Sequence, residues 1–395
     1  MSIFFRAAAP ERRGSWAEWL AGSDIVGSAT KSGVRVTSDK AMRVSAFWST
    51  THLLASIVSG LPVDVFRGSG ASKQEVVPQP QFVATPSLLM TRREWMYQGM
   101  TSLLHSGNAV GLGERDKMQR WRTVEWLDIA SVTIRQESQL RGATYWVGGE
   151  QIDPSKVVHL RAFCKPGSVV GRSVVEYQAE QLGIALAGRD YGAGFYGSGG
   201  HPTALFKNTA QTFTPEKSAE MKRRYLSLMS GRREPLLLGS DWTYTPLQAS
   251  MAESALVETM SYTDAQIARL FGPGLAEILG YTTPASGGDL TYTNRLDRSL
   301  DVLQFTASYW VNLFEDFLTG AIARPQTVRL NVGSLLRMDA KSQTETFRVE
   351  REIGLRNIDE IRNLLDLPPL PNGQGEDYAP LKAGGATKGN PNEGA

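Results

Sequence analysis

The stretch that most constrains this chain is residues 249–320, which has the pattern of a helix, a break, a polar loop and a long helix. The first helical pattern runs to Phe271 and stops at Gly272-Pro273-Gly274, and glycine and proline of this kind end helices. Small and polar residues fill 280–289, and a second helical pattern runs from Thr291 to Gly320. A polar loop held between two helices is unusual unless another molecule passes beside it.

Composition bounds the class of protein without naming a function. The 395 residues are enough for two or three domains, and 41% hydrophobic with 21% charged residues is typical of a globular chain. A net charge of +2 neither demands nor excludes nucleic acid. The single cysteine, Cys164, excludes an internal disulfide and a cysteine-based zinc site, and it suits a reducing cytoplasm.

No targeting or membrane segment is expected. The first ten residues hold only a short apolar stretch followed by charges, which does not make a secretory signal. Residues 44–65 are apolar, but His52, Gly60 and Pro62 interrupt them, so they fall short of the ~20 apolar residues that span a bilayer. The default expectation is a soluble protein.

The first part of the chain predicts a mixed domain over 40–165, after a loose arm at 1–38. One helix is expected from about Lys40, capped by Ser38 or Asp39, and a strand follows at 63–67. Thr91 and Glu94 have the spacing of a capping box at the start of a second helix, which should stop near Gly107. Short strands are then predicted over 108–113, 123–127, 131–136, 143–147 and 157–161.

A long helical pattern covers 173–198 and contains four glycines. Gly183, Gly188, Gly192 and Gly194 each weaken a helix by roughly 0.5–1 kcal/mol relative to alanine. They indicate either a bend or a close neighbouring helix. That neighbour could belong to the same subunit or to another one.

Residues 200–249 form a compact insert between two long helices. It predicts a strand, a helix beginning at Thr214-Pro215, and two further strands. Its basic residues form the strongest electrostatic feature of the chain. They suit a solvated face, or contact with nucleic acid or an acidic partner, and they are Lys217, Lys222, Arg223, Arg224, Arg232 and Arg233.

The long helix after the polar loop should start in water and end in the core. Its predicted apolar face consists of Leu296, Leu300, Leu303, Trp310, Phe314 and Phe317, widened by Val302, Phe305, Tyr309, Leu313 and Leu318. A strand follows Pro325, a charged helix runs from Asp339 to about Glu352, and Asn357 can cap a short helix. The tail at 372–395 is rich in Gly, Pro, Lys and Asn and is expected to be disordered.

No constellation of residues predicts catalysis, and no cofactor or metal is implied. Walker A and GxSxG motifs do not occur, and the four histidines have no metal-ligand spacing. Asp297 and Asp301 lie four residues apart and could share a metal, but Arg298 between them favours a solvated face. We therefore predict that the chain is not an enzyme.

Four ordered pieces of the sequence resemble the portal proteins of tailed bacteriophages, the head–tail connector family. They are an opening helix at 44–62 followed by a strand, HisSerGlyAsnAlaValGly at 105–111, Gly171-Arg172-Ser173 leading into the helix that ends at 195–202, and GlnIleAlaArgLeuPheGlyProGly at 266–274. The last is followed by Thr293-Asn294 and by GlyLeuArgAsnIleAspGluIleArgAsnLeuLeuAspLeuProPro at 354–369. The resemblance covers about 40–370. It departs where Pro273-Gly274-Leu275 replaces the family's usual Val-Pro-Pro.

The resemblance implies an α+β portal-type fold that assembles as a ring. Its parts would be a flexible arm (1–39), a wing (40–172), a first stem helix (173–199), a clip (200–249), a second stem helix (250–272), a tunnel loop (273–293), a long helix with a wing strand (294–338), a crown (339–371) and a disordered tail (372–395). The tunnel loop would face DNA through Thr282, Thr283, Ser286, Gly287, Gly288, Thr291 and Asn294. The six basic residues of the clip would contact terminase, a connector protein or DNA.

The implied function is a structural one. Twelve copies would form a DNA channel at one capsid vertex of a virion, assembled in the bacterial cytoplasm. Terminase would package the genome through this channel, and the genome would later leave by the same route. The implied partners are non-specifically bound double-stranded DNA, the terminase large subunit, the major capsid protein and head–tail connector proteins, with no membrane. The alternatives are a nuclease-like DNA-processing enzyme, which would need clustered acidic ligands, and a capsid adaptor without a channel.

Overall fold

The computed structural model describes residues 28–68, 73–136, 142–197, 204–208, 214–220, 223, 242–246, 250–281, 299–334, 340–365 and 367–378. The chain divides into two compact units, residues 1–331 and residues 332–395. The first unit contains the candidate site, so its core is described first. Among the described residues, no helix combines the length and apolar character that crossing a bilayer requires.

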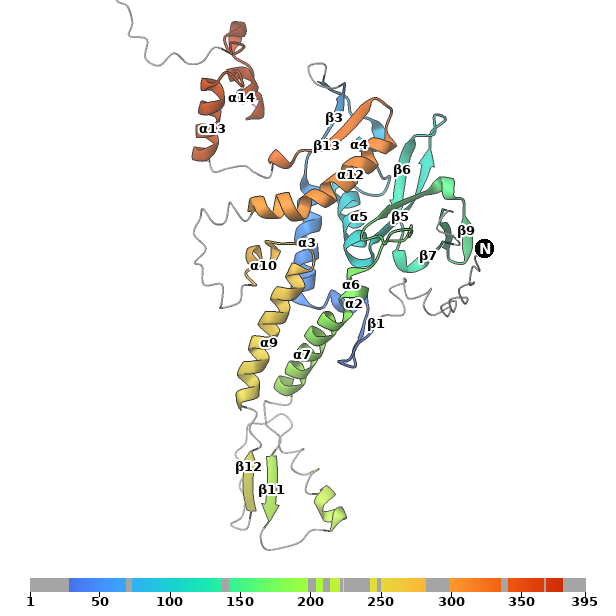
Figure 1. The fold of residues 1–395 in the computed structure, drawn as a ribbon, viewed down its shortest axis with the longest axis vertical. Helices are drawn as coiled ribbons and strands as arrows, with labels where there is room; N and C mark the ends of the chain where they lie inside the picture. Colours follow the sequence, from blue (N-terminus) through green and yellow to red (C-terminus); the bar gives the residue numbers. More distant parts are fainter. Residues whose placement is uncertain are drawn as a thin grey trace, which may run out of the picture. The chain divides into compact units, whose positions relative to one another are not determined.

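The centre of the first unit is a helix pair, α3 (Ser45–Gly60) and α5 (Arg92–Ser106), which pack against each other (Figure 1). Buried Leu54, Val58, Trp95 and Met100 fill the space between them and the neighbouring sheets. The predicted capping box is confirmed, since Thr91 accepts from the Glu94 amide and Glu94 accepts from the Thr91 amide. The helix ends at Gly107, whose φ of 72° is left-handed.

Three small antiparallel sheets surround this pair. Their strand orders are β13-β3-β4, β10-β5-β6 and β7-β8-β9. The strands predicted in this region are confirmed, β4 and β9 were not predicted, and the strand predicted at 235–239 in the insert lies outside the described residues. The strand bounds are β3 Val63–Arg67, β4 Gln74–Glu75, β5 Asn108–Arg115, β6 Trp121–Trp126, β7 Val132–Arg135, β8 Thr144–Val147, β9 Glu150–Ile152, β10 Val157–Arg161 and β13 Gln326–Leu330. Short elements complete this region: α4 Gln81–Ala84 and the 3₁₀ turns η2 Ile129–Ser131 and η3 Pro154–Lys156.

Strand β13 returns from late in the first unit to pair with β3. Val328 lies opposite Val65, and Leu330 lies opposite Val63 in the antiparallel register. Buried Glu315 fixes this return, because its carboxylate accepts from the Leu330 amide at 2.8 Å and from the Arg329 guanidinium. Helix α12 is thereby tied to the β13-β3-β4 sheet.

Two helix predictions near the start of the chain differ from the structure. The single helix expected from Lys40 is two helices, α2 (Ser38–Ala41) and α3, because buried Val44 takes an extended backbone between them. The cap of α2 is Thr37, not Ser38 or Asp39. The expected arm at 1–39 also ends in regular structure, because β1 (Ser28–Ala29) and β2 (Arg35–Val36) form a hairpin.

The helix predicted over 173–198 is divided into α6 (Val174–Tyr177) and α7 (Ala179–Gly197). Gln178 separates them with φ −109° and ψ 23°. Hydrogen bonds still bridge the division, since the Gln178 amide donates to Val174 O and the Leu182 amide donates to Gln178 O. The interruption is therefore a slight irregularity rather than a change of direction.

The long helix contains a π-helical segment that the sequence pattern did not predict. Residues Val302–Ala307 are π-helical and lead into α12 (Ser308–Ala321). Its wider turns rotate the buried face. Val302, Trp310, Phe314 and Leu318 are buried as expected, whereas the predicted face members Leu300, Phe305 and Tyr309 are 44%, 61% and 49% exposed. The expectation of a buried end is confirmed, whereas the predicted wet start at 291–298, with Leu296, lies outside the described residues.

The second unit contains η6 (Val332–Ser334), α13 (Ala340–Glu352), α14 (Ile358–Leu364) and the 3₁₀ turn η7 (Pro371–Gly373). The predicted Asn357 cap is confirmed and forms a capping box with Glu360. The tail was expected to be disordered from 372, but 372–378 packs on α14. The Asp359 amide donates to Gly375 O at 3.1 Å, and Tyr378 Oη donates to Glu360.

Candidate functional site

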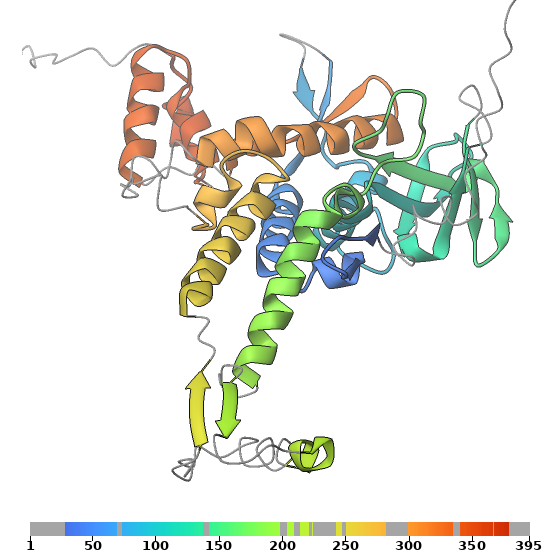
Figure 2. The ribbon, with the colours of Figure 1, turned by 60° about the horizontal axis from the view of Figure 1, so that its bottom comes forward.

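Within the first unit, two helices connect the core to a distal hairpin. Helix α7 leads out to β11 (Ala204–Asn208), and β12 (Trp242–Pro246) leads back into α9 (Ser250–Arg269). The two strands pair antiparallel, with Phe206 opposite Tyr244. Figures 1 and 2 show α7 and α9 side by side from two directions, and α9 also contacts α3.

The glycines of α7 have different surroundings. A Cβ on Gly183 would lie 2.8 Å from Ser32 Oγ of the β1–β2 hairpin. A Cβ on Gly188 would lie 3.6 Å from Met260 of α9. Gly192 and Gly194 have nothing within 4 Å. Packing within one chain therefore explains the first two glycines and leaves the last two open.

The break after α9 is tightly built. Gly272 has a φ of 141°, and a Cβ there would lie 2.3 Å from Thr306 Oγ1. Thr306 Oγ1 in turn donates to Pro273 O at 3.0 Å. Only glycine fits this backbone and this contact. The break therefore rests directly on the π-helical segment that begins the long helix.

A short helix follows the break, where a loop was expected from 273. It is α10 (Leu275–Ile278), with left-handed Gly274 at its N-cap. Arg269 at the end of α9 and Glu277 of α10 form an ion pair at 3.5 Å. Leu275 and Ala276 are fully buried. Apolar contact with the core overrides the glycine-rich sequence in this part of the expected loop.

The next contact anchors the chain to the central helix. Tyr281 donates its amide to Ala276 O at 2.8 Å, and its hydroxyl lies 3.2 Å from Ser49 Oγ of α3. Phe271 packs on Phe47 of the same helix, with ring centroids 5.6 Å apart. Residues 272–281 thus form a fixed base from which the chain continues into 282–298.

The predicted loop residues themselves lie outside the described residues. These are Thr282, Thr283, Ser286, Gly287, Gly288, Thr291 and Asn294. Of the predicted basic residues of the insert, Lys217 and Arg223 are described and exposed. Lys222, Arg224, Arg232 and Arg233 are not described. The base of the loop is therefore visible, whereas its predicted contact residues remain predictions.

A buried polar network joins strands β5, β8 and β10 to the segment before α6, and the sequence analysis did not predict it. Asn108 Nδ2 donates to Ser106 O and to Gly171 O, while Asn108 Oδ1 accepts from the Gly171 amide at 2.7 Å. His159 Nε2 lies 2.9 Å from the same Asn108 Oδ1, and its Nδ1 lies 3.1 Å from Tyr145 Oη. Because Asn108 Oδ1 can only accept, His159 must donate through Nε2 and accept from the tyrosine through Nδ1.

Burial keeps this imidazole neutral. Burial and, to a smaller extent, the nearby charge of Arg161 together lower the pKa of His159 to about 3. The chain passes from this network through Arg172 into α6, whose N-cap Ser173 donates its hydroxyl to His105 O. A Cβ on Gly171 would lie 1.9 Å from Gly107 O, so the two backbones touch. The network fixes where the chain leaves the sheet of β5 and β10 and enters α6 and α7.

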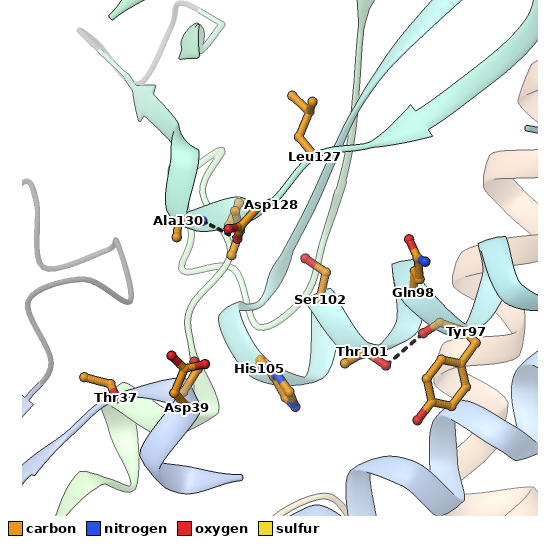
Figure 3. Close-up of a pocket in the computed structure, with 12 residues that line it drawn as sticks. Thr37, Asp39, Tyr97, Gln98, Thr101, Ser102, His105, Leu127, Asp128 and Ala130 are labelled. Carbon is orange, nitrogen blue, oxygen red and sulfur yellow. Dashed lines mark hydrogen bonds between the residues drawn. The ribbon is translucent and has the colours of Figure 1, made fainter. Parts of the chain in front are cut away.

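A polar hollow of about 430 Å³ lies beside this junction (Figure 3). Asp39 from α2, Asp128 from the segment before η2 and His105 from α5 line it. Burial lowers the pKa of His105 and the charge of Asp39 opposes this by a smaller amount, which leaves the pKa at about 4. The Asp128 carboxylate already accepts a hydrogen bond from the Ala130 amide, which caps the η2 turn. Among the described residues, no three His, Cys, Asp or Glu side chains come together to hold a metal ion.

A second basic surface surrounds the β5–β6 turn. A hollow of about 720 Å³ there is lined by Arg67, Arg115, Lys117, Arg120 and Arg122 among other residues. Arg115 stacks over the Trp121 ring at 3.7 Å, and Arg120 pairs with Asp116 at 2.6 Å. The basic residues at 115–122 could have indicated this surface, but the sequence analysis did not predict it.

Comparison with known proteins identifies the family. Residues 45–366 match the model of a protein family described as "Phage portal protein". This chain belongs to that family. The probable portal protein of Streptomyces phage phiC31 is 26% identical over 382 residues, covering 91% of this chain and 82% of the relative. The portal protein of Enterobacteria phage HK97 is 22% identical over 381 residues, covering 91% and 88%.

Solved structures share the fold. An HK97 family phage portal protein from Corynebacterium diphtheriae aligns with a TM-score of 0.55 at 17% identity, covering 75% of this chain and 95% of the other. The neck of a native GTA particle computed with C12 symmetry aligns with a TM-score of 0.54 at 17% identity, covering 84% and 92%. The predicted α+β portal-type fold is thus confirmed. The role of a portal follows from the family, which is structural rather than enzymatic.

Proposed function

We propose that copies of this chain form a closed ring of twelve subunits at one vertex of a phage-like capsid, around a channel for duplex DNA. Terminase would drive the genome inward through this channel, and the genome would leave by the same route. The major capsid protein and head–tail connector proteins would surround the ring. The particle is a virion or a gene-transfer particle, and its parts assemble in the bacterial cytoplasm.

The observation that carries this proposal is that the chain leaves the core along α7, returns along α9, and is then anchored over residues 272–281. The family match spans residues 45–366, a range that includes α7, α9 and α12. Residues 272–281 are held by Thr306 and Ser49, so the loop at 282–298 leaves a rigid support. A ring of such supports would place identical loops around one axis. The C12 symmetry of the structurally similar neck of a GTA particle supports a ring of this kind.

The mechanism needs no catalytic residue. Small hydroxyl and glycine residues at 282–288 would contact DNA without reading bases, so that sliding remains possible. A strongly cationic lining would trap the phosphates, and the net charge of +2 suits a conduit. The basic residues of the clip would contact terminase during packaging and a connector protein afterwards. Two of them, Lys217 and Arg223, are described in the structure and are exposed.

The first experiment is imaging with mass measurement. The purified chain, concentrated stepwise, should give annular particles with a central hole in negative stain and a mass of twelve subunits. Solid particles, or monomers at every concentration, would contradict the proposal.

The second experiment tests the loop. Deleting 282–288 should preserve rings while reducing DNA packaging or DNA retention. A deletion of equal length in the tail at 383–389 serves as the control. Unchanged packaging and retention after the loop deletion would reject its proposed role in the channel.

A further inference from the structure

The hollow beside the β5–β6 turn is a surface that the proposed function does not use. It is lined by Arg67 with residues from 76–82, by residues from 114–122 and by residues from 321–326 after α12, so only the folded chain brings its walls together. Five cationic side chains line it against the carboxylates of Glu114 and Asp116. We call this feature the basic hollow.

Two of the five cations are tied to the protein and shape the basic hollow. Arg115 stacks over the Trp121 ring at 3.7 Å and donates to two backbone carbonyls at 3.0 and 2.8 Å. The same ring contacts strand β5, since a Cβ on Gly113 would lie 2.5 Å from it. Arg120 pairs with Asp116 at 2.6 Å. These contacts neutralise part of the charge and fix the turn.

The other three cations are available to a ligand. Within the described part of the chain, the charged groups of Arg67, Lys117 and Arg122 have no hydrogen-bond or ion-pair partner, and all three residues are exposed. Glu114 is exposed and unpaired by the same criterion, so the balance of unpaired charge is positive. A concave surface lined by one sign of charge focuses its field on a ligand of the opposite sign. The basic hollow therefore favours an anion.

The basic hollow also has an apolar wall. Val76, Pro78 and Pro80 line it and are half-buried or exposed. Val77, between them in sequence, is 80% exposed, and Met118 in the β5–β6 turn is 72% exposed. Exposed apolar side chains gathered beside a charged rim are typical of protein-interaction sites. The ligand should therefore carry apolar groups as well as negative charge.

We propose that the basic hollow binds an extended acidic segment of another protein, in which apolar side chains alternate with carboxylates. The guanidinium groups of Arg67 and Arg122 can each donate two parallel hydrogen bonds to a carboxylate, and Lys117 adds a compact charge. Val76 and the prolines beside it would cover the apolar side chains of the segment. This inference goes beyond the proposed function and does not depend on the ring.

Nucleic acid fits the basic hollow less well than a peptide does. A duplex presents its phosphates on a convex ridge without apolar side chains, so it would contact the outermost cations and leave the apolar wall in water. The hollow has a volume of about 720 Å³, and concave sites of roughly 300–1,000 Å³ suit small ligands or a few side chains. A short stretch of peptide matches both its size and its chemistry.

A peptide array tests the proposal, with the chain labelled at its only cysteine, the exposed Cys164. One set of short peptides alternates acidic residues with leucine, valine or phenylalanine. A second set has asparagine and glutamine in place of the acids, and a third has serine in place of the apolar residues. The chain should bind the first set and bind the other two at least tenfold more weakly. Equal binding of the amide set, or binding to none of the sets, would overturn the inference.

Two double variants of equal net charge locate the binding site. Arg67→Glu with Arg122→Glu should weaken the best peptide at least tenfold in fluorescence anisotropy. Arg35→Glu with Arg43→Glu reverses two exposed arginines outside the basic hollow and should leave binding nearly unchanged. Val77→Ser changes no charge and should also weaken binding. Urea unfolding checks that each variant is folded, and equal weakening by the two double variants would overturn the inference.

Two further outcomes would assign the basic hollow to a different occupant. Duplex DNA that binds through Arg67 and Arg122, while acidic peptides fail to bind, would make it a nucleic-acid surface. Peptide binding by dilute monomers that is lost in rings would assign it to the neighbouring copy. Either result would overturn the inference. A chain that binds the acidic peptides but forms no rings would contradict the proposed function and leave this inference standing.

Discussion

Replacing His159 by glutamine is expected to remove about half of the acid sensitivity that buried histidines give this fold. His159 is neutral in the folded chain, with Nε2 donating to Asn108 and Nδ1 accepting from Tyr145. Glutamine keeps a donor for Asn108 but cannot take up a proton in this pH range. The variant therefore changes proton uptake more than it changes shape.

The sign and size follow from proton linkage. Burial lowers the pKa of His159 from 6.5 to about 3. Between these two pH values the histidine is protonated in the unfolded chain and neutral in the folded chain. The contribution of His159 to the free energy of unfolding is therefore complete above pH 6.5 and is lost progressively as the pH falls toward 3. At pH 5 the loss is about 2 kcal/mol, at 1.36 kcal/mol for each pH unit below 6.5. His105, with a pKa of about 4, adds about 2 kcal/mol by the same reasoning.

The assay is urea unfolding at pH 7.5 and pH 5.0, followed by tryptophan fluorescence, for the unmodified chain and for H159Q. The free energy of unfolding should fall about 2 kcal/mol less in the variant between the two pH values. H105Q should reduce the loss of unfolding free energy between the two pH values by a similar amount. The double variant should reduce that loss by about 4 kcal/mol. If H159Q lost as much stability as the unmodified chain, to within about 0.5 kcal/mol, the buried neutral histidine would be refuted.

Three further predictions concern the loop base and the clip. T306V should lower the free energy of unfolding by about 1 kcal/mol through loss of the hydrogen bond to the proline carbonyl of the break, while T306S should not, as measured by urea unfolding. G272A should cost at least about 2 kcal/mol because its φ of 141° and its contact with Thr306 exclude a Cβ, and equal stability of G272A and a G192A control would contradict this. Reversing both Lys217 and Arg223 to glutamate should weaken binding of the terminase large subunit about tenfold in biolayer interferometry. A matched double reversal on the wing should have no effect, and binding unchanged by the clip reversal would remove these residues from the interface.

Sequence alone determined the features that depend on a few neighbouring residues. The capping boxes at Thr91 and Asn357 and the left-handed stop at Gly107 follow from side-chain and backbone chemistry within one helical turn. The same holds for the strands of the wing and for the break at Gly272-Pro273-Gly274. The order of these local elements was also enough to indicate the family, which the match over 45–366 bears out.

Only the tertiary structure decided which distant residues meet. Val328 pairs with Val65, and Asn108 meets His159 and Gly171, although no local rule connects them. The π-helical segment turned Phe305 outward, because contact between Thr306 and the break outweighs the regular helical period. Helix caps and turns act over about four residues, whereas a hydrogen bond or packed side chain across the fold depends on chain geometry that no short window contains. For this reason the polar loop could be recognised in the sequence, while the support beneath it could not.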